Sequence, residues 1–268
     1  MNYYQDKRIL ITGAASGMGR LMSIAMGSLG GKMILMDIDP TGLTRVKDEL
    51  LKKNIKVSTH ICDLALRDQV YNTASQIGQV DILINNAGIV TGKYFLDAPD
   101  ELIEKTFQVN TLAHFWLVKS FLPGMLERNS GHIVSIASAG GLAATPRMSD
   151  YCSSKFAAVG FDESLRLELK KKGSKIKTTV VCPFVVSTGM FEGAKTRFNF
   201  LLPILSPEYV VKRIIKAVAR GKKRLIMPRF IYTIFPLRLL PVSAQDAILN
   251  FLGANNSMDE FVGRTIKT

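Results

Sequence analysis

The stretch of sequence that decides the fold is Thr12-Gly13-Ala14-Ala15-Ser16-Gly17-Met18-Gly19. It follows a short aliphatic run at 8–12 and leads into an amphipathic helical pattern at 20–29. After a strand, glycines permit a tight turn, a close approach to a pyrophosphate, and packing of the next helix near the strand. That helix would aim its free N–H groups at the phosphates of a dinucleotide, although a glycine-rich turn without a ligand is the simpler alternative. We expect a cofactor to contact Gly13, Ser16, Gly17, Met18 and Gly19.

Short aliphatic or β-branched runs alternate with amphipathic helical patterns along the chain. The predicted strands lie at 8–12, 32–36, 56–61, 81–84, 132–136, 178–182 and 224–227. Among the helical patterns, one places Val210, Ile214 and Val218 on a single face. Such alternation implies right-handed crossovers and a parallel sheet that is covered by helices. We predict an α/β, doubly wound Rossmann fold with about seven parallel strands and helices on both faces.

The composition and length are those of one large globular domain. The chain has 268 residues, of which 47% are hydrophobic and 21% charged, and no Pro/Ser-rich linker or internal repeat divides it. We predict a single NAD(P)-binding Rossmann domain over 1–268, ending in an irregular, apolar C-terminal extension at about 228–268. The three scattered cysteines provide neither a disulfide framework nor a zinc pattern, so no metal is expected.

The charge is strongly positive, with 35 Lys and Arg against 22 Asp and Glu. This excess suits nucleic acid, an anionic membrane or an acidic ligand. Because no basic stretch with interleaved aromatics and no helix-turn-helix or zinc pattern is present, we expect no nucleic acid as partner. One basic cluster, at 220–224, precedes an apolar stretch at 225–240, which suits peripheral contact with a membrane, although a solvated surface explains it equally well. With no signal peptide or spanning segment recognised, we expect a cytoplasmic protein that is not secreted.

Asp37 ends the second predicted strand, after the glycine-rich loop. A carboxylate at this place can accept both hydroxyls of the adenosine ribose, and it repels a 2′-phosphate. The alternative is a solvated residue in the turn before Asp39-Pro40. The position favours the ribose contact, so NAD is the expected cofactor and NADP the less favoured one.

The spacing Gly13-x-x-x-Gly17-x-Gly19 resembles that of the short-chain dehydrogenase/reductase family, and further motifs agree in order. Asn85-Asn86-Ala87-Gly88 is similar to the NNAG motif of the family, and Tyr151-Cys152-Ser153-Ser154-Lys155 to its YxxxK motif. The resemblance implies catalytic roles for Asn110, Ser138, Tyr151 and Lys155. It implies cofactor contacts by Asp63, Leu64, Asn86, Ala87, Gly88, Tyr151, Lys155, Pro183, Val186 and Thr188. Since family members commonly form homodimers or homotetramers, the same is expected here.

A narrower resemblance extends toward the C-terminus. The stretches 151–156, 160–165, 181–184, 188–191, 227–230 and 251–254 are similar to the retinol and 17β-hydroxysteroid dehydrogenase branch, whose members oxidise lipophilic alcohols. In the family, the segment at about 188–205 is a substrate lid, and here it is strongly apolar. Together these features imply an NAD-dependent oxidoreductase that interconverts an alcohol and a carbonyl on a retinol-, steroid- or long-chain-lipid-like substrate. The alternatives are an enzyme for small polar carbonyls, its lid closed by packing, and a non-catalytic, membrane-associated nucleotide-binding protein.

The spacing of Tyr151 and Lys155 suggests how the proton moves, because residues four apart share one helix face. A free tyrosine has a pKa of about 10, and lowering it by about 3 units takes roughly 4 kcal/mol. One positive charge at about 4 Å in an effective dielectric of about 20 supplies that much. We therefore expect Lys155, aided by the oxidised nicotinamide, to lower the Tyr151 pKa, while Ser138 holds the substrate oxygen. By resemblance, Asn110 anchors a relay water; no chemistry is assigned to His60, His114 or His132.

Overall fold

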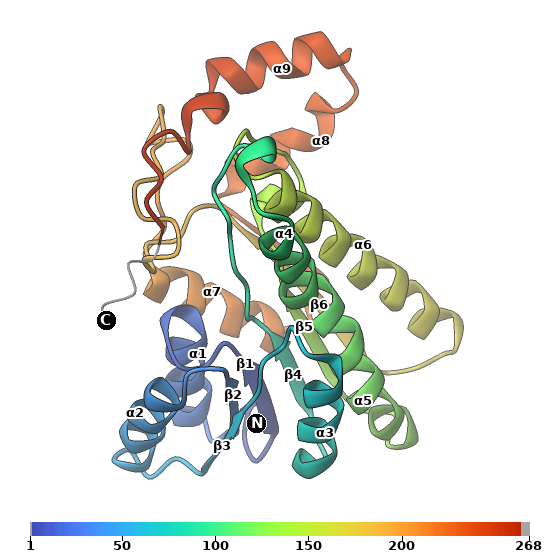
Figure 1. The fold of residues 1–268 in the computed structure, drawn as a ribbon. Coiled ribbons are helices and arrows are strands. Elements are labelled where there is room, and N and C mark those ends of the chain that lie inside the picture. The colour runs from blue at the N-terminus through green and yellow to red at the C-terminus, as the bar shows by residue number, and fades with distance from the viewer. Residues whose placement is uncertain (1, 264–268) are drawn as a thin grey trace.

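A seven-stranded parallel sheet forms the centre of the molecule, as the computed structural model of residues 2–263 shows (Figure 1). The strands are β1 (Arg8–Thr12), β2 (Lys32–Asp37), β3 (Val57–Ile61), β4 (Ile82–Asn85), β5 (His132–Ile136), β6 (Lys177–Pro183) and β7 (Arg224–Met227). Their order across the sheet is β3-β2-β1-β4-β5-β6-β7, and every neighbouring pair is parallel. The predicted doubly wound fold is confirmed.

Helices cover both faces of this sheet (Figure 1). The helices are α1 (Gly17–Ser28), α2 (Pro40–Leu51), α3 (Arg67–Ile77), α4 (Asp100–Phe107), α5 (Ala113–Glu127), α6 (Ser149–Lys171), α7 (Pro207–Ala219), α8 (Ile234–Leu237) and α9 (Val242–Phe251). Apolar residues of α1, α2 and α7 share one core with the sheet, and those of α3, α5 and α6 share the other. Successive strand residues alternate between these cores, as Ile82 and Leu83 do, because side chains along a strand point to opposite faces.

The direction of winding reverses at β1, which pairs with β2 on one side and β4 on the other. In open α/β sheets, ligands bind in the crevice at the carboxyl ends of the strands beside such a reversal. The Thr12 hydroxyl ties the two strand ends together, because it accepts hydrogen bonds from the backbone N–H groups of Asn86 at 3.0 Å and Ala87 at 3.1 Å. The crevice therefore lies where the predicted glycine-rich loop begins.

The C-terminal extension follows β7 and lies above the carboxyl edge of the sheet, where α8 and α9 are drawn in red (Figure 1). The prediction of an irregular extension is wrong, because η4 (Arg229–Thr233), α8, α9 and η5 (Ala254–Asn256) make much of it helical. Its last part is bound to the segment after β6, since Lys195 N–H donates to the Ser257 carbonyl at 2.9 Å and Val262 N–H to the Glu192 carbonyl at 2.9 Å. Residues 264–268 of the predicted extension lie outside the described residues.

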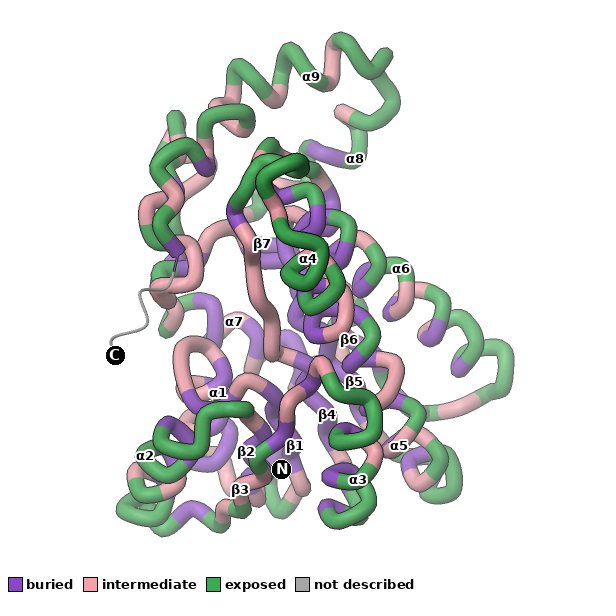
Figure 2. Tube along the Cα trace, in the orientation of Figure 1, coloured by how far each residue is buried: buried purple, intermediate pink, exposed green. Residues whose placement is uncertain are grey.

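The outer side of the extension is exposed, as the green trace of α9 shows (Figure 2). Exposed apolar residues here include Leu239, Val242 and Phe251. Within residues 2–263, none of the helices has the length and apolar character that crossing a bilayer requires.

Candidate active site

The glycine-rich loop turns sharply between β1 and α1. Gly13 has a φ of +64° and Gly17 a φ of +52°, a left-handed conformation that side chains other than glycine rarely adopt. A Cβ on Gly13 would lie 2.9 Å from Ala87 Cα, and one on Gly19 would overlap the Gly13 carbonyl. With Ser16 at the N-cap, Met18 lies in the first turn of α1. The loop thus forms a glycine cradle at a helix N-terminus, which fits the pyrophosphate of a dinucleotide.

Asp37 lies beside this loop at the end of β2. Its Oδ2 accepts a hydrogen bond from Ala15 N–H at 2.9 Å, and its Oδ1 accepts one from Asp39 N–H at 3.1 Å. Each carboxylate oxygen keeps a further lone pair, so both remain able to accept a ribose hydroxyl. The structure therefore places Asp37 next to the glycine cradle, as the sequence predicted.

Asp63 and Leu64 follow β3, next to the end of β2, where Cys62 N–H donates to the Asp37 carbonyl at 2.9 Å. The Asp63 carboxylate accepts a hydrogen bond from Ala65 N–H at 2.9 Å, which is a local turn contact ahead of α3. Leu64 is buried with the core of α3, α5 and α6. The cofactor contact expected of this pair stays a prediction.

The Asn86-Ala87-Gly88 segment after β4 connects the glycine cradle to the other predicted residues. The Asn86 side chain donates from Nδ2 to the Thr12 carbonyl at 2.9 Å. At the far end of the segment, a Cβ on Gly88 would lie 3.3 Å from both Asn110 Oδ1 and Lys155 Nζ. The absence of a side chain at Gly88 therefore lets these two groups approach the same backbone.

Asn110 is fully buried in η2 (Gln108–Leu112), a single π-helical turn between α4 and α5. Its Oδ1 accepts from Ile89 N–H at 2.8 Å, and its Nδ2 donates to the Ile89 carbonyl at 2.9 Å and to Ser154 Oγ at 3.0 Å. Such turns interrupt a helix at functional sites. The Asn110 side chain holds the loop after β4 against α6, so it positions the segment that faces Lys155.

Ser138 and Tyr151 meet at the carboxyl end of β5. Ser138 Oγ accepts a hydrogen bond from Gly140 N–H at 3.0 Å, and it also bonds the Tyr151 hydroxyl. The Tyr151 ring is buried and contacts the edge of Phe191 at a centroid distance of 5.5 Å. The structure thus brings the predicted serine and tyrosine into direct contact.

Lys155 lies one helical turn after Tyr151, with its Nζ 5.6 Å from the centre of the Tyr151 ring. Burial lowers the pKa of Lys155 to about 8, and its Nζ donates to the Ile136 carbonyl at 3.0 Å. Burial also raises the pKa of Tyr151 above its ordinary value, and the hydrogen bond with Ser138 offsets only part of this rise. Burial therefore outweighs the Ser138 hydrogen bond at the Tyr151 phenol. The expectation that Lys155 and the oxidised nicotinamide together lower the Tyr151 pKa stays a prediction.

The turn after β6 lies at the same edge of the sheet. Pro183 ends β6, and Thr188 N–H donates to the Val186 carbonyl at 2.8 Å. Val186 bridges to Leu205 at the far end of the predicted lid. The three predicted cofactor contacts, Pro183, Val186 and Thr188, thus lie in or beside the turn at the carboxyl end of β6.

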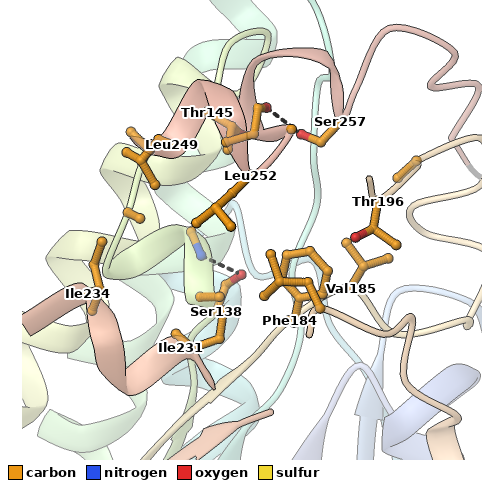
Figure 3. A pocket seen from close by; sticks show the side chains of 18 of the residues that line it. Ser138, Thr145, Phe184, Val185, Thr196, Ile231, Ile234, Leu249, Leu252 and Ser257 are labelled. Carbon is orange, nitrogen blue, oxygen red and sulfur yellow. Dashed lines mark hydrogen bonds between the residues drawn. The ribbon is translucent and has the colours of Figure 1, made fainter. Parts of the chain in front are cut away.

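An apolar pocket of about 1030 Å³, including space open to solvent, extends from Ser138 toward the C-terminal extension (Figure 3). Phe184 and Val185 line it next to Ser138, and Leu252 lies across from them (Figure 3). The predicted lid contributes Phe191, Ala194, Lys195, Thr196 and Leu202. The extension contributes Phe230, Ile231, Thr233, Ile234, Leu237, Leu249, Leu252, Gly253, Ala254, Ser257 and Met258.

Comparisons with known proteins agree with this geometry. A family model described as short chain dehydrogenase matches residues 7–197. The chain belongs to the short-chain dehydrogenase family. Epidermal retinol dehydrogenase 2 of Mus musculus is 46% identical over 267 residues, covering 97% of this chain and 86% of that protein. Retinol dehydrogenase 10-B of Danio rerio is 42% identical over 283 residues, covering 95% and 84%.

The fold is shared with solved structures of the family. A short-chain dehydrogenase/reductase from Burkholderia phymatum in complex with NAD superimposes with a TM-score of 0.80 at 28% identity, covering 96% of this chain and 98% of that one. The predicted family and its retinol dehydrogenase branch are confirmed. This short-chain dehydrogenase is therefore an oxidoreductase of alcohols and carbonyls with a nicotinamide cofactor.

Sequence reasoning missed part of the pocket of this short-chain dehydrogenase. The contribution of Leu237, Leu249 and Met258 comes from the extension, and the loop at 143–148 supplies a further wall. The apolar character of 225–240 was the available signal, but it indicated an exposed surface as readily as a pocket wall. In the structure the extension lies over the carboxyl edge of the sheet, and this placement brings one of its sides to the pocket.

Proposed function

We propose that this short-chain dehydrogenase uses NAD to oxidise a lipophilic alcohol, in the class of retinoids, hydroxysteroids or long-chain lipids. The observation that carries the proposal is the apolar pocket, whose lining includes Ser138, the residue that bonds the Tyr151 hydroxyl. A polar carbonyl substrate would leave its other polar groups against Phe184, Ile234 and Leu252, where burial without a hydrogen-bond partner is costly.

Each of the residues expected to be catalytic has a separate role in the proposed reaction. Bound nicotinamide supplies the hydride acceptor and, when oxidised, a positive charge. Tyr151 takes the proton of the alcohol as the hydride leaves the carbinol carbon, and in the reverse direction it donates that proton. Ser138 holds the substrate oxygen beside the Tyr151 hydroxyl. Lys155 opposes the effect of burial on the Tyr151 pKa and holds the nicotinamide ribose, while Asn110 maintains the loop at Gly88 that faces it.

The preference for NAD over NADP rests on Asp37. Its carboxylate lies against Ala15 N–H in the glycine cradle, where it would accept the ribose hydroxyls and repel a 2′-phosphate. The Asp37→Ala variant should lower the ratio of kcat/KM with NAD to that with NADP by about tenfold or more, because the repulsion is lost. Steady-state kinetics with both cofactors measure this ratio, and an unchanged ratio would show that Asp37 does not read the ribose.

Turnover of a substrate panel tests the reaction. NADH formation should be seen with retinol, a 17β-hydroxysteroid or a long-chain alcohol, and it should fall by about 10²-fold or more in Tyr151→Phe. Tyr4→Phe is the matched control, because Tyr4 is also buried but donates to the Ile215 carbonyl, away from the pocket. Turnover of sugars or small carbonyls alone would favour the small polar alternative. NAD binding without any turnover would favour the non-catalytic one.

The extension is also proposed to contact an anionic membrane. Leu239 is 86% exposed and Val242 70% exposed, and these apolar side chains lie beyond the basic cluster at 220–224. Arg224 of that cluster pairs with Glu163 and lies 5.5 Å from the ring centre of Phe235 in the extension, so the basic cluster adjoins the apolar surface. Co-sedimentation with vesicles should increase with phosphatidylserine content and decrease in Leu239→Asp. Equal binding to neutral vesicles would count against the proposal.

We also propose a homo-oligomer, from the family resemblance and from apolar side chains that α4 and η2 leave exposed. Leu102 and Leu112 are each 40% exposed. Light scattering of the purified protein should give a dimer or tetramer mass, and a monomer at micromolar concentration would contradict it.

A further inference from the structure

Three buried polar side chains lie beneath Lys155 without the hydrogen bonds that their burial calls for. They are Asn85, His114 and Ser135, each at most 2% exposed. Across residues 2–263, no hydrogen-bond partner is found for Asn85 Nδ2 and Oδ1, for either ring nitrogen of His114, or for Ser135 Oγ. The reaction proposed above uses none of these five atoms.

The sheet places Asn85 and Ser135 side by side. They are direct partners in the pairing of β4 with β5. Two residues earlier on each strand, Leu83 and Ile133 point into the core under α3, α5 and α6. Because side chains repeat their direction every two residues along a strand, Asn85 and Ser135 point to that same face, one step closer to the carboxyl edge.

His114 approaches the same place from α5. It lies on the buried stripe of α5 that includes Ala113 and Leu117, which pack in the core with Leu83. The first turn of α5 follows η2, whose Asn110 reaches Gly88 just beyond the end of β4. The start of this helix therefore lies over the carboxyl ends of the strands, where Asn85 and Ser135 are found.

Lys155 closes the cluster from α6. Its Nζ donates to the carbonyl of Ile136, the residue after Ser135. The pKa of His114 is lowered to about 3, first by burial and then by the charge of Lys155, so the imidazole is neutral and within electrostatic range of the ammonium. An ammonium has three protons, and one of them is donated to the Ile136 carbonyl. The other two remain for the nicotinamide ribose and for a group on the His114 side.

A second buried histidine, His132, has a hydrogen-bond partner for each of its ring nitrogens. His132 is as deeply buried as His114, and its pKa is also lowered to about 3 by burial. Its Nδ1 bonds the Tyr3 hydroxyl at 2.9 Å and its Nε2 bonds Thr179 Oγ1 at 2.8 Å. Buried polar groups in proteins are bonded to protein or to ordered water, so the group of Asn85, His114 and Ser135 calls for water.

We propose that Asn85, His114 and Ser135 form a buried water-binding site beneath Lys155, and that neutral His114 positions the Lys155 ammonium through that water. His114 is thus a positioning residue rather than a catalytic one. The role given to Lys155 rests on the proposed function, whereas the water site does not.

The expected consequence is a higher Lys155 pKa than an apolar neighbour would allow. The titratable groups around Lys155 are Tyr151 of its own helix, Cys182 of β6, which raises the Lys155 pKa, and His114 of α5, whose pKa the charge of Lys155 lowers; Asp162 of α6 acts in turn on Cys182. Replacing His114 by leucine removes the acceptor and leaves the ammonium more desolvated. The pKa of Lys155 should then fall by roughly one unit. Lys155 would lose its proton at a lower pH, and cofactor binding would weaken at that pH.

The first experiment is a crystal structure of the NAD complex at a resolution that shows ordered water. One or more waters should bond His114 and at least one of Asn85 and Ser135, with a link to Lys155 Nζ. Direct bonds among these side chains, with no water between them, would overturn the proposal. This measurement does not depend on turnover, so it stands even if the proposed substrate class is wrong.

The second experiment follows NAD affinity against pH by fluorescence for the wild type, His114→Leu, His114→Asn and the control His132→Leu. The pH at which affinity falls should shift down by roughly one unit in His114→Leu and return toward wild type in His114→Asn. The control should lose stability without this shift. An unshifted profile in a folded His114→Leu would refute the positioning role. If the NAD affinity of the wild type did not change with pH, the role proposed for Lys155 itself would be refuted.

Discussion

Asp162 provides a prediction whose size follows directly from the structure. It lies on α6 and is 1% exposed, and its Oδ2 accepts a hydrogen bond from Thr178 Oγ1 at 3.3 Å. Its other oxygen has no hydrogen-bond partner within residues 2–263. Burial raises the pKa of Asp162 to about 7 from its ordinary 3.8, although the Thr178 hydroxyl and the charges of Arg166 and Arg224 oppose the rise.

The raised pKa means that the folded chain holds a proton on Asp162 which the unfolded chain releases above about pH 4. Stability from this group is therefore complete below pH 4 and is lost as the pH rises to about 7. The whole shift corresponds to roughly 4 kcal/mol, and more than half of it falls between pH 5 and pH 8. Asp162→Asn removes the ionisation while keeping the shape of the side chain.

Urea unfolding of the wild type and Asp162→Asn at pH 5 and pH 8 measures this difference. The free energy of unfolding of the variant, relative to wild type, should rise by roughly 2 to 3 kcal/mol between the two pH values, with similar m-values. The buried histidines titrate in both proteins and cancel in the comparison. A relative stability that stays the same at both pH values would refute the reasoning.

Asp150 offers the matched control on the same helix. It is also buried, but its Oδ2 accepts hydrogen bonds from the hydroxyls of Thr91 and Thr106. Asp150→Asn would present an N–H group to hydroxyls that now donate to a carboxylate, so it should destabilise the protein at pH 8. A gain in stability at pH 8 in both variants would show that the effect is not specific to the unpaired carboxyl of Asp162.

Three further predictions concern the cradle and the pocket. Gly13→Ala should weaken NAD binding by at least tenfold in calorimetry, because its Cβ would meet Ala87 Cα at 2.9 Å and its φ is +64°; unchanged affinity would contradict the tight approach. Arg147→Ala should raise the KM for a lipophilic alcohol while leaving NAD affinity unchanged. The reason is that Arg147 donates to the carbonyls of Met258 and Asp259, both at 2.8 Å, and so holds the extension over the pocket. A matching loss of NAD affinity would indicate general unfolding. Leu252→Asp should lower kcat/KM for lipophilic alcohols by about tenfold or more, since it puts a charge into the apolar pocket; activity with small carbonyls is the control, and equal losses on both would argue against a role in substrate choice.

Much of the fold was predictable from local patterns. The strand and helix periodicities of the chain match the observed order of elements, and the spacing of Gly13, Gly17 and Gly19 predicts the turn that begins the crevice. Tyr151 and Lys155 are four residues apart on one helix, so their common face is also a local property. These features depend on residues that are close in the sequence.

The extension was only partly predictable. Its apolar composition was evident, but α8 and α9 were expected as irregular chain, and prolines lie at 228, 236 and 241 of it. Pro228 directly precedes η4 and Pro241 directly precedes α9, whereas Pro236 lies within α8. Which side of the extension faces the pocket depends on contacts with the segment after β6, and these join residues far apart in the chain.

The sequence by itself determined the order of elements and the glycine cradle, because short-range spacing and side-chain type are enough to predict them. The set of Asn110, Ser138, Tyr151 and Lys155 came from the family resemblance, of which only the common face of Tyr151 and Lys155 is a matter of local spacing. Only the tertiary structure decided the electrostatics of that set. Burial raises the pKa of Tyr151, and buried polar atoms of Asn85, His114 and Ser135, from β4, α5 and β5, have no hydrogen-bond partner within residues 2–263. Desolvation and hydrogen-bond satisfaction depend on everything that surrounds a group in space, and those neighbours come from segments that are remote in sequence.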